Sequence, residues 1–247
     1  MELPLWRTTF LRKMPLMPHS ITRESRDTKL MYEFTHTYAE DRTDPARRWS
    51  PGRRETTSAV SSDKVDPVLV ADRPRVLIRR IRPDDKAAFQ ALVTSLSLDS
   101  RRRRFYSAIS ELSDSALTYL TEVDFERHFA WVGIAVDEPG QPVVAEARYV
   151  RYRDRPDTAE FALLVADAYQ RGGLGRCLLT TMASIARSSG VRCFEGLVLA
   201  GNSPMIRLLR SLGAQIGPPT YGVVEAAWQL DEHSLTNSDR IVERAQT

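Results

Sequence analysis

Residues 170–176 read Gln170-Arg171-Gly172-Gly173-Leu174-Gly175-Arg176 and join an apolar run to an amphipathic run. Three glycines in such a loop allow the backbone to turn tightly and to approach a ligand without obstruction by side chains. The free amides at the start of a following helix, with the positive end of its dipole, suit phosphate oxygens. Arg171 and Arg176 add positive charge at the same place. The segment therefore predicts a phosphate-binding loop, with a simple tight turn as the alternative.

Two common nucleotide-binding motifs do not fit this loop. A Walker A loop requires Lys-Ser or Lys-Thr after the glycines, and neither follows here. The spacing also differs from the GxGxxG pattern, and no acidic ribose partner follows a second strand at a suitable distance. The phosphate ligand is therefore neither a nucleoside triphosphate in a P-loop nor a dinucleotide in a Rossmann fold.

Strand-like and helix-like patterns continue on both sides of the loop. Apolar or alternating runs predict strands at residues 76–81, 131–136, 143–149, 159–165, 193–199 and 221–228. Helices are predicted after Pro83, after the capping residue Ser113, from the loop to Gly190, and from the capping residue Ser203 to Gly213. The order is strand, two helices, three strands, helix, strand, helix, strand. It predicts an α/β sandwich on a mixed sheet and excludes a Rossmann fold or a barrel.

The first 72 residues differ in composition from the rest of the chain. They mix charges of both signs with Ser, Thr and Pro and show no sustained periodicity. Such a segment cannot bury enough apolar surface to offset its ordering entropy. We therefore expect a largely disordered leader and linker over residues 1–72, with one short helix near 28–40. One domain over 73–230 and a polar tail over 231–247 complete the expected organisation.

Composition excludes several classes of protein. The 247 residues carry 35 basic and 32 acidic side chains, and a formal charge of +3 is too small for a nucleic-acid coat. No run approaches the roughly 18 apolar residues of a membrane-spanning helix, and the start lacks the apolar core of a secretory signal. Cys177 and Cys193 form no disulfide framework, and the scattered histidines have no metal-site spacing. We expect a cytoplasmic protein with no metal, nucleic-acid or membrane partner, although basic residues near the start leave an organelle transit peptide open.

The pattern Gln-x-x-Gly-x-Gly at residues 170–175 resembles the pyrophosphate-binding signature of the GNAT superfamily of N-acetyltransferases. The resemblance extends from residue 75 to about 230 and is strongest to bacterial Pat-type protein lysine acetyltransferases. The matching segments are Ile81-Arg82-Pro83-Asp84-Asp85, Arg104-Phe105-Tyr106, residues 159–165 (AEFALLV) and residues 198–205 (VLAGNSPM). Ala145 stands where that family usually has glycine, and Gly201 stands where glutamate is common. The regulatory domain that many such relatives carry is not matched either.

The resemblance implies a GNAT-like, mostly antiparallel mixed sheet flanked by helices, with acetyl-CoA as the acyl donor and no metal. It implies that the backbone of Leu163, Leu164 and Val165 binds the acyl and pantetheine groups. Asn202 would hold the pantetheine arm, with an ordinary loop or helix-capping asparagine as the alternative. The residues implied to bind the pyrophosphate are Gln170, Arg171, Gly172, Gly173, Leu174, Gly175 and Arg176.

Glu160 is the candidate catalytic base. A free lysine amine has a pKa of about 10.4, so acyl transfer to it needs a group that removes a proton. Glu160 lies in an otherwise apolar strand, where a carboxylate is costly unless it is paired or used. Its place in the AEFA motif of the resembling family favours the catalytic interpretation over an outward-facing strand glutamate. We name no general acid, because Met205, Ile206 and Arg207 stand where many relatives have a tyrosine.

These observations predict an enzyme that transfers the acetyl group of acetyl-CoA to a lysine side chain by direct attack in a ternary complex. Acyl-CoA synthetases are the protein substrates that the resemblance implies. Acetylation of a small amine and a catalytically idle acyl-CoA-binding sensor remain as alternatives. A route through an acyl-cysteine is disfavoured because Cys177 and Cys193 lie in apolar patterns without a nearby histidine. The run Arg101–Arg104 is interpreted as a solvated helix or loop, with binding of adenosine phosphates or an acidic partner as the alternative.

Overall fold

The computed structural model describes residues 64–68 and 75–231. Most of the expected leader, including the helix expected near residues 28–40, and most of the expected tail lie outside the described residues. One part of the expected leader and linker, residues 64–68, is described. Residues Lys64–Val68 form strand β1, which pairs antiparallel with β2 (Val76–Arg80). The strand contains Pro67 at the edge of the sheet, where one side of the backbone needs no ladder bond.

The described strands form one eight-stranded sheet in the order β1-β2-β3-β4-β5-β6-β8-β7. The further strands are β3 (His128–Ala135), β4 (Val143–Arg151), β5 (Thr158–Val165), β6 (Cys193–Leu199), β7 (Gln215–Ile216) and β8 (Val223–Gln229). Neighbouring strands are antiparallel except for β5 and β6, which are parallel. This arrangement confirms the predicted mixed, mostly antiparallel sheet and adds β1 and β7 to it.

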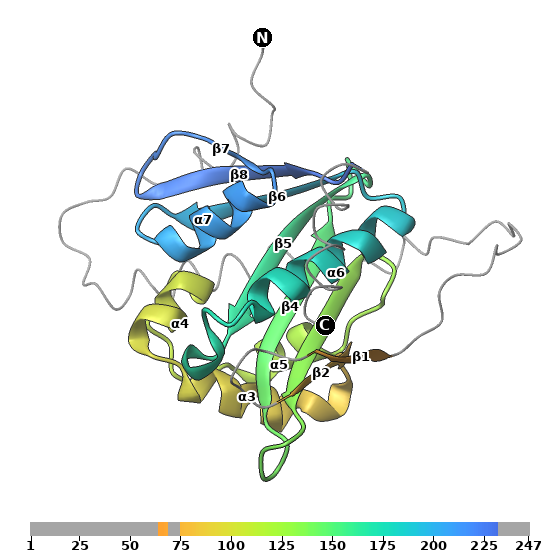
Figure 1. Ribbon diagram of the computed structural model, residues 1–247, viewed down its shortest axis with the longest axis vertical. Helices are drawn as coiled ribbons and strands as arrows, with labels where there is room; N and C mark the ends of the chain where they lie inside the picture. The colour runs from red at the N-terminus through yellow and green to blue at the C-terminus, as the bar shows by residue number, and fades with distance from the viewer. Residues whose placement is uncertain (1–63, 69–74, 232–247) are drawn as a thin grey trace, which may run out of the picture.

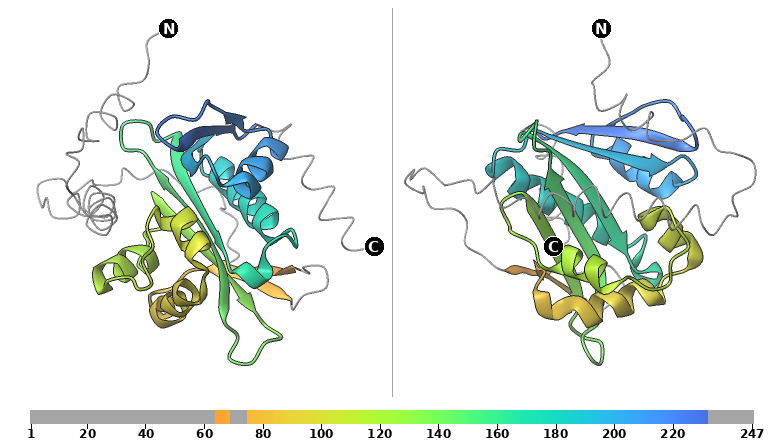
Figure 2. Two further views of the ribbon diagram at one scale, coloured as in Figure 1. Left: turned by 90° about the vertical axis from the view of Figure 1, so that its left-hand side faces the viewer. Right: turned by 180° about the vertical axis from the view of Figure 1, so that it is seen from behind.

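Helices cover both faces of the sheet (Figure 1 and Figure 2). On one face lie α3 (Lys86–Ser95), α4 (Leu98–Phe105) and α5 (Asp114–Thr121), and on the other lie α6 (Leu174–Ser188) and α7 (Ser203–Ser211). The 3-10 turns Pro83–Asp85 (η3) and Asp167–Tyr169 (η4) precede α3 and the loop before α6. A separate hydrophobic cluster fills the space beneath each helical layer. Within the described ranges, no helix is both long and apolar enough to cross a bilayer.

Local patterns locate most of these helices correctly. Ser113 caps α5 as predicted, because its hydroxyl oxygen accepts the Ala116 N–H at 3.2 Å. Two expectations need correction. Asn202 rather than Ser203 caps α7, and three helices rather than two precede the run of three strands. The additional helix is α4, which carries the arginines of the run Arg101–Arg104.

Candidate functional site

The sheet opens between its two parallel strands. In the described structure, β5 and β6 pair only through Thr158–Glu160 and Cys193–Glu195. Beyond these residues the two strands diverge, as Figure 1 shows. Each strand therefore presents a stretch of backbone edge to the other across a gap that is closed at Glu160 and open toward α6.

The β5 edge of the gap is formed by its odd-numbered residues. The N–H of Ala166 donates to the carbonyl of Val144 at 2.8 Å, and the direction of hydrogen bonding alternates along an antiparallel ladder. Leu164 therefore turns its backbone groups toward β4, whereas Leu163 and Val165 turn theirs toward the gap. Three residues were expected to offer backbone amides to a ligand here. The amide of Leu164 faces β4 instead, so only Leu163 and Val165 can offer theirs at the gap.

The β6 edge of the gap is contacted by a side chain from the helical layer that contains α4. The N–H of Ala200 donates to the carbonyl of Gly222 at 2.9 Å, so the same alternation turns the backbone of Leu197 toward the gap. The hydroxyl of Tyr106, the residue that follows α4, donates to the Leu197 carbonyl. Tyr106 was part of a matching segment in the sequence, but the sequence alone indicated no role for it.

Helix α6 begins beside the open end of the gap. Gly173 is its capping residue with a φ of +89°, and it has no side chain to occupy the first turn. The first helical bond runs from the Cys177 N–H to the Gly173 carbonyl at 3.0 Å. The N–H groups of Leu174, Gly175 and Arg176 therefore have no partner within the helix. Together with the positive end of the dipole, they provide what the predicted phosphate site requires.

Gly175 brings this helix end close to β5. A Cβ at this position would lie 3.2 Å from Cδ2 of Leu163 and 3.8 Å from Cγ2 of Val165. These are the two residues whose backbone faces the gap. The glycine therefore places the first turn of α6 next to the free strand edge.

Gln170 orders the loop through its side chain. Its amide nitrogen donates to the Val165 carbonyl at 3.0 Å and to Oγ of Ser100 at 3.1 Å. These bonds connect the end of β5 to the first turn of α4. Direct contact of Gln170 with a ligand stays a prediction, because the structure shows its amide donors within the protein.

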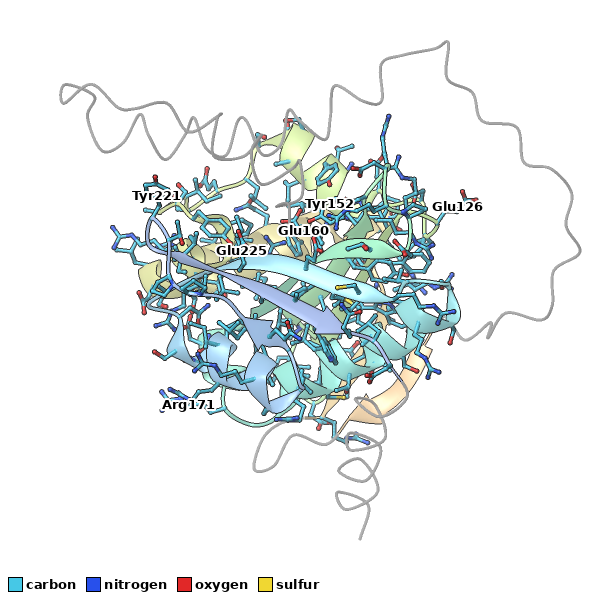
Figure 3. All side chains as sticks on the ribbon, turned by 90° about the horizontal axis from the view of Figure 1, so that it is seen from above. Glu126, Tyr152, Glu160, Arg171, Tyr221 and Glu225 are labelled. Carbon is cyan, nitrogen blue, oxygen red and sulfur yellow. The ribbon has the colours of Figure 1, made fainter. Side chains whose placement is uncertain are left out.

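The two arginines of the loop lie near the first turn of α6. Arg171 is exposed and has a φ of +65°, and Figure 3 shows it at the edge of the molecule, apart from Glu160. Arg176 is partly buried and donates to Oγ of Ser211 at the end of α7. Gly172 lies between Arg171 and the capping residue. Contact of either arginine with a phosphate stays a prediction.

Glu160 lies at the closed end of the gap. It is partly buried and stands opposite Val150 of β4 and Glu195 of β6. Figure 3 shows it beside Tyr152, which follows β4. Its neighbour Glu195 forms two hydrogen bonds of 3.0 Å with the guanidinium of Arg155. The negative charge of Glu195 is therefore balanced locally by a cation.

The charge of Glu160 acts on two tyrosines. Burial raises the pKa of Tyr106, and the negative charge of Glu160 raises it further. The pKa of Tyr152 is raised by burial first, then by the charges of Glu160 and Glu195. Both phenols therefore remain protonated at neutral pH. The sequence alone indicated a role for neither tyrosine.

A buried ionic cluster lies between β4 and the helices α4 and α5. Glu146 is fully buried and accepts hydrogen bonds from Arg148 and, at 3.4 Å, from Arg104 of α4. Arg148 also contacts Nε2 of His128 at 2.9 Å and donates to the Leu120 carbonyl at 3.0 Å. A guanidinium can only donate, so His128 accepts through Nε2 in this contact. The cluster thus places two guanidinium groups beside one carboxylate, and burial lowers the pKa of Arg148.

Asn202 has a structural task in addition to any contact with a ligand. It is buried, and its Oδ1 accepts the Met205 N–H at 3.4 Å, which caps α7. The structure therefore shows that Asn202 is a helix-capping residue, which was the alternative to a ligand contact. The contact with a pantetheine arm stays a prediction.

The cysteines offer no activated thiol. Burial raises the pKa of Cys177, and burial with the nearby charge of Glu195 raises the pKa of Cys193 to about 11. A raised pKa lowers the fraction of reactive thiolate, which argues against an acyl-cysteine route. Among the residues that the structure describes, no three His, Cys, Asp or Glu side chains gather as metal ligands would.

Comparison with known proteins gives consistent matches to one family. The profile of the acetyltransferase (GNAT) family matches residues 96–214. Acetyltransferase Pat of Mycolicibacterium smegmatis is 33% identical over 158 residues, which cover 64% of this chain and 46% of that protein. Acetyltransferase PA5475 of Pseudomonas aeruginosa is 30% identical over 142 residues, covering 58% and 76%. The crystal structure of the GNAT domain of S. lividans PAT aligns with a TM-score of 0.62 at 26% identity, covering 70% of this chain and 99% of that domain.

The chain spans about half the length of the Mycolicibacterium relative, but it covers most of the Pseudomonas relative and nearly all of the S. lividans domain. The matched region contains the gap between β5 and β6, the glycine loop and the start of α6. These matches confirm the predicted fold class and the resemblance found in the sequence. The chain therefore belongs to the GNAT family of acetyltransferases.

Proposed function

We propose that this protein transfers the acetyl group of acetyl-CoA to the side-chain amine of a lysine in a protein substrate. The proposal is carried by the gap between β5 and β6, with Glu160 at its closed end and the start of α6 at its open end. Glu160 and Val165 are five residue steps apart along the extended strand, which corresponds to roughly 17 Å. A candidate base and a candidate phosphate site thus lie at opposite ends of one strand edge.

Acetyl-CoA fits this arrangement as an extended ligand. Its pyrophosphate oxygens would accept hydrogen bonds from the N–H groups at the start of α6. The two amides of the pantetheine arm would pair with the backbone of Leu163 and Val165, much as an added strand pairs with a sheet edge. Arg171 and Arg176 would neutralise phosphate charge. The acetyl group would then lie near Glu160.

The chemistry assigned to the protein is proton removal and positioning. Glu160 accepts a proton from the lysine ammonium, directly or through one water. The neutral amine attacks the thioester carbon, so that a C–N bond forms and the C–S bond breaks. A backbone N–H at the gap edge, with that of Leu163 as the candidate, stabilises negative charge on the carbonyl oxygen. The thiolate leaves without a general acid, and the nitrogen releases its second proton to solvent as the amide forms.

A protein lysine as acceptor is supported by the resemblance to Pat-type enzymes and by the relative named acetyltransferase Pat. Acyl-CoA synthetases of the cytoplasm are therefore the first substrates to test.

The test combines labelled acetyl-CoA with a protein extract and with a purified acyl-CoA synthetase. We expect the wild type and Glu126→Gln to label lysines at equal rates, because Glu126 is exposed and lies far from Glu160 in Figure 3. Glu160→Gln should label them at least about 100-fold more slowly, since a general base contributes about 10²–10⁴ in rate. Acetyl-CoA binding, measured by calorimetry, should be the same in all three proteins.

Each other result has a definite meaning. Equal labelling by the wild type and Glu160→Gln removes Glu160 as the base. Transfer to polyamines or aminoglycosides without transfer to any protein identifies a small-molecule acetyltransferase. Tight binding of acetyl-CoA without transfer to any amine identifies an acyl-CoA sensor.

A further inference from the structure

Tyr106 occupies an unusual position for a large aromatic residue. It follows the last turn of α4 with a φ of +54°, in the left-handed region that bulky non-glycine residues seldom adopt. Such conformations persist when the surrounding structure requires them, and they concentrate at functional sites. Here the conformation directs the phenol from α4 toward the gap between β5 and β6.

The hydroxyl of Tyr106 has a fixed direction. Its single hydrogen is donated to the Leu197 carbonyl, which faces the gap. The phenol stays neutral because burial and the charge of Glu160 both raise its pKa. Its oxygen can therefore act toward other groups only as a hydrogen-bond acceptor.

We propose that Oη of Tyr106 accepts a hydrogen bond from the acceptor amine and, together with Glu160, forms the amine-binding part of the site. This inference rests on the function proposed above and adds a substrate-positioning residue to it. An ammonium group has three N–H donors, and leaving water is costly unless they find acceptors. The carboxylate of Glu160 satisfies one donor, and the Tyr106 oxygen, held at the same gap by its bond to the Leu197 carbonyl, offers a second acceptor.

The same contact orients the amine after its proton is lost. A neutral amine keeps two N–H groups and one lone pair. When one N–H stays bonded to a fixed oxygen, rotation about the side chain is restricted, and the lone pair can be held toward the thioester. Glu160 thus removes the proton, whereas Tyr106 fixes the direction of attack.

The test measures amine binding separately from turnover. The probe is Nα-acetyl-lysine methylamide, titrated by NMR into the full chain in the presence of free coenzyme A. We expect Tyr106→Phe to weaken binding of the probe about tenfold, as for loss of a hydrogen bond to a charged group. The affinity for coenzyme A should change less than twofold. Tyr119→Phe, on α5 against His128, is the matched control and should bind the probe like the wild type.

A purely structural tie between α4 and β6 gives the opposite pattern. In that case Tyr106→Phe lowers the thermal midpoint and weakens coenzyme A binding while probe binding is unchanged, and this result overturns the proposal. Absence of probe binding in the wild type overturns it as well. Tyr106→Asn is a second variant, because asparagine tolerates left-handed backbone, and the same tenfold weakening is expected.

These measurements distinguish failure of the proposed acetyl transfer from failure of the proposed role of Tyr106. If the wild type binds the probe but transfers no acetyl group, acetyl transfer is excluded, while the role of Tyr106 in amine binding is still decided by the titration. In an active enzyme, Tyr106→Phe should raise the KM for the amine about tenfold with a smaller change in kcat.

Discussion

Gly173 and Gly190 stand at the two ends of α6 and share one backbone conformation, with φ values of +89° and +93°. A Cβ at either position would meet nothing within 4 Å, so alanine there costs backbone strain alone. We expect Gly173→Ala and Gly190→Ala to lower the free energy of unfolding by a similar amount, about 1–2 kcal/mol. Only Gly173→Ala should also weaken coenzyme A binding, because it reorients the N–H groups of the first turn. Urea unfolding and calorimetric titration measure the two effects, and equal coenzyme A affinity in both variants would contradict the phosphate site.

Residues of the site differ in how far the sequence could identify them. Glu160 and the loop glycines could be proposed from the sequence because their signals are local: a charge in an apolar strand and a glycine pattern before a helix. Tyr106 could not, because its defining contact is with Leu197, 91 positions away. Arg104 likewise bonds Glu146, which is 42 positions away, so the buried ionic cluster could not be predicted from the sequence. Pairings at such separations depend on how strands and helices assemble, and one sequence carries no direct record of them.

Helix α4 shows the same limit at the scale of elements. Ser100 and Phe105 are its only buried residues, so it has no apolar stripe that would reveal a helical period. It is held instead by the Ser97 cap and by hydrogen bonds of 2.8 and 2.9 Å from Ser97 to the carboxylate of Asp167. By contrast, α6 places six buried residues on one face, and its pattern was sufficient to predict it.

Strand β5 allows a test of the acetyl-CoA position at single-residue detail. The N–H groups of Leu163 and Val165 face the gap, whereas that of Leu164 belongs to the ladder with β4. We expect coenzyme A to slow amide hydrogen exchange at Leu163 and Val165 by at least about tenfold, because a bound amide must open before it exchanges. Leu164 is an internal control that should be protected with or without the ligand. Unchanged exchange at Leu163 and Val165 under saturating coenzyme A would show that the pantetheine arm does not follow this edge.

Three carboxylates in different parts of the molecule accept hydrogen bonds that fix a strand, a turn and a helix start. Asp85 bonds Arg79 at 2.6 and 2.7 Å, Asp124 accepts three backbone N–H groups at 2.8–2.9 Å, and Asp167 accepts from the start of α4. Burial alone would raise the pKa of each, but the hydrogen bonds outweigh it and all three pKa values are lowered. A pKa that is lower in the folded state than in the unfolded state stabilises the fold at higher pH. This contribution is complete above about pH 4, the usual range of an unfolded aspartate, and is lost as pH falls through the folded values.

Acid unfolding should therefore depend on these three hydrogen-bonded carboxylates. We expect the free energy of unfolding to fall steeply below about pH 4, where the unfolded state binds protons that the folded state still excludes. Asp124→Asn should reduce stability at pH 6, because the charged acceptor of three N–H groups is lost, and should make the decline below pH 4 shallower. Asp154→Asn, at an exposed position after β4, is the matched control and should leave the slope unchanged. Urea unfolding at half-unit steps from pH 6 to pH 3 measures the difference, and parallel curves for the wild type and Asp124→Asn would exclude this residue as a source of acid sensitivity.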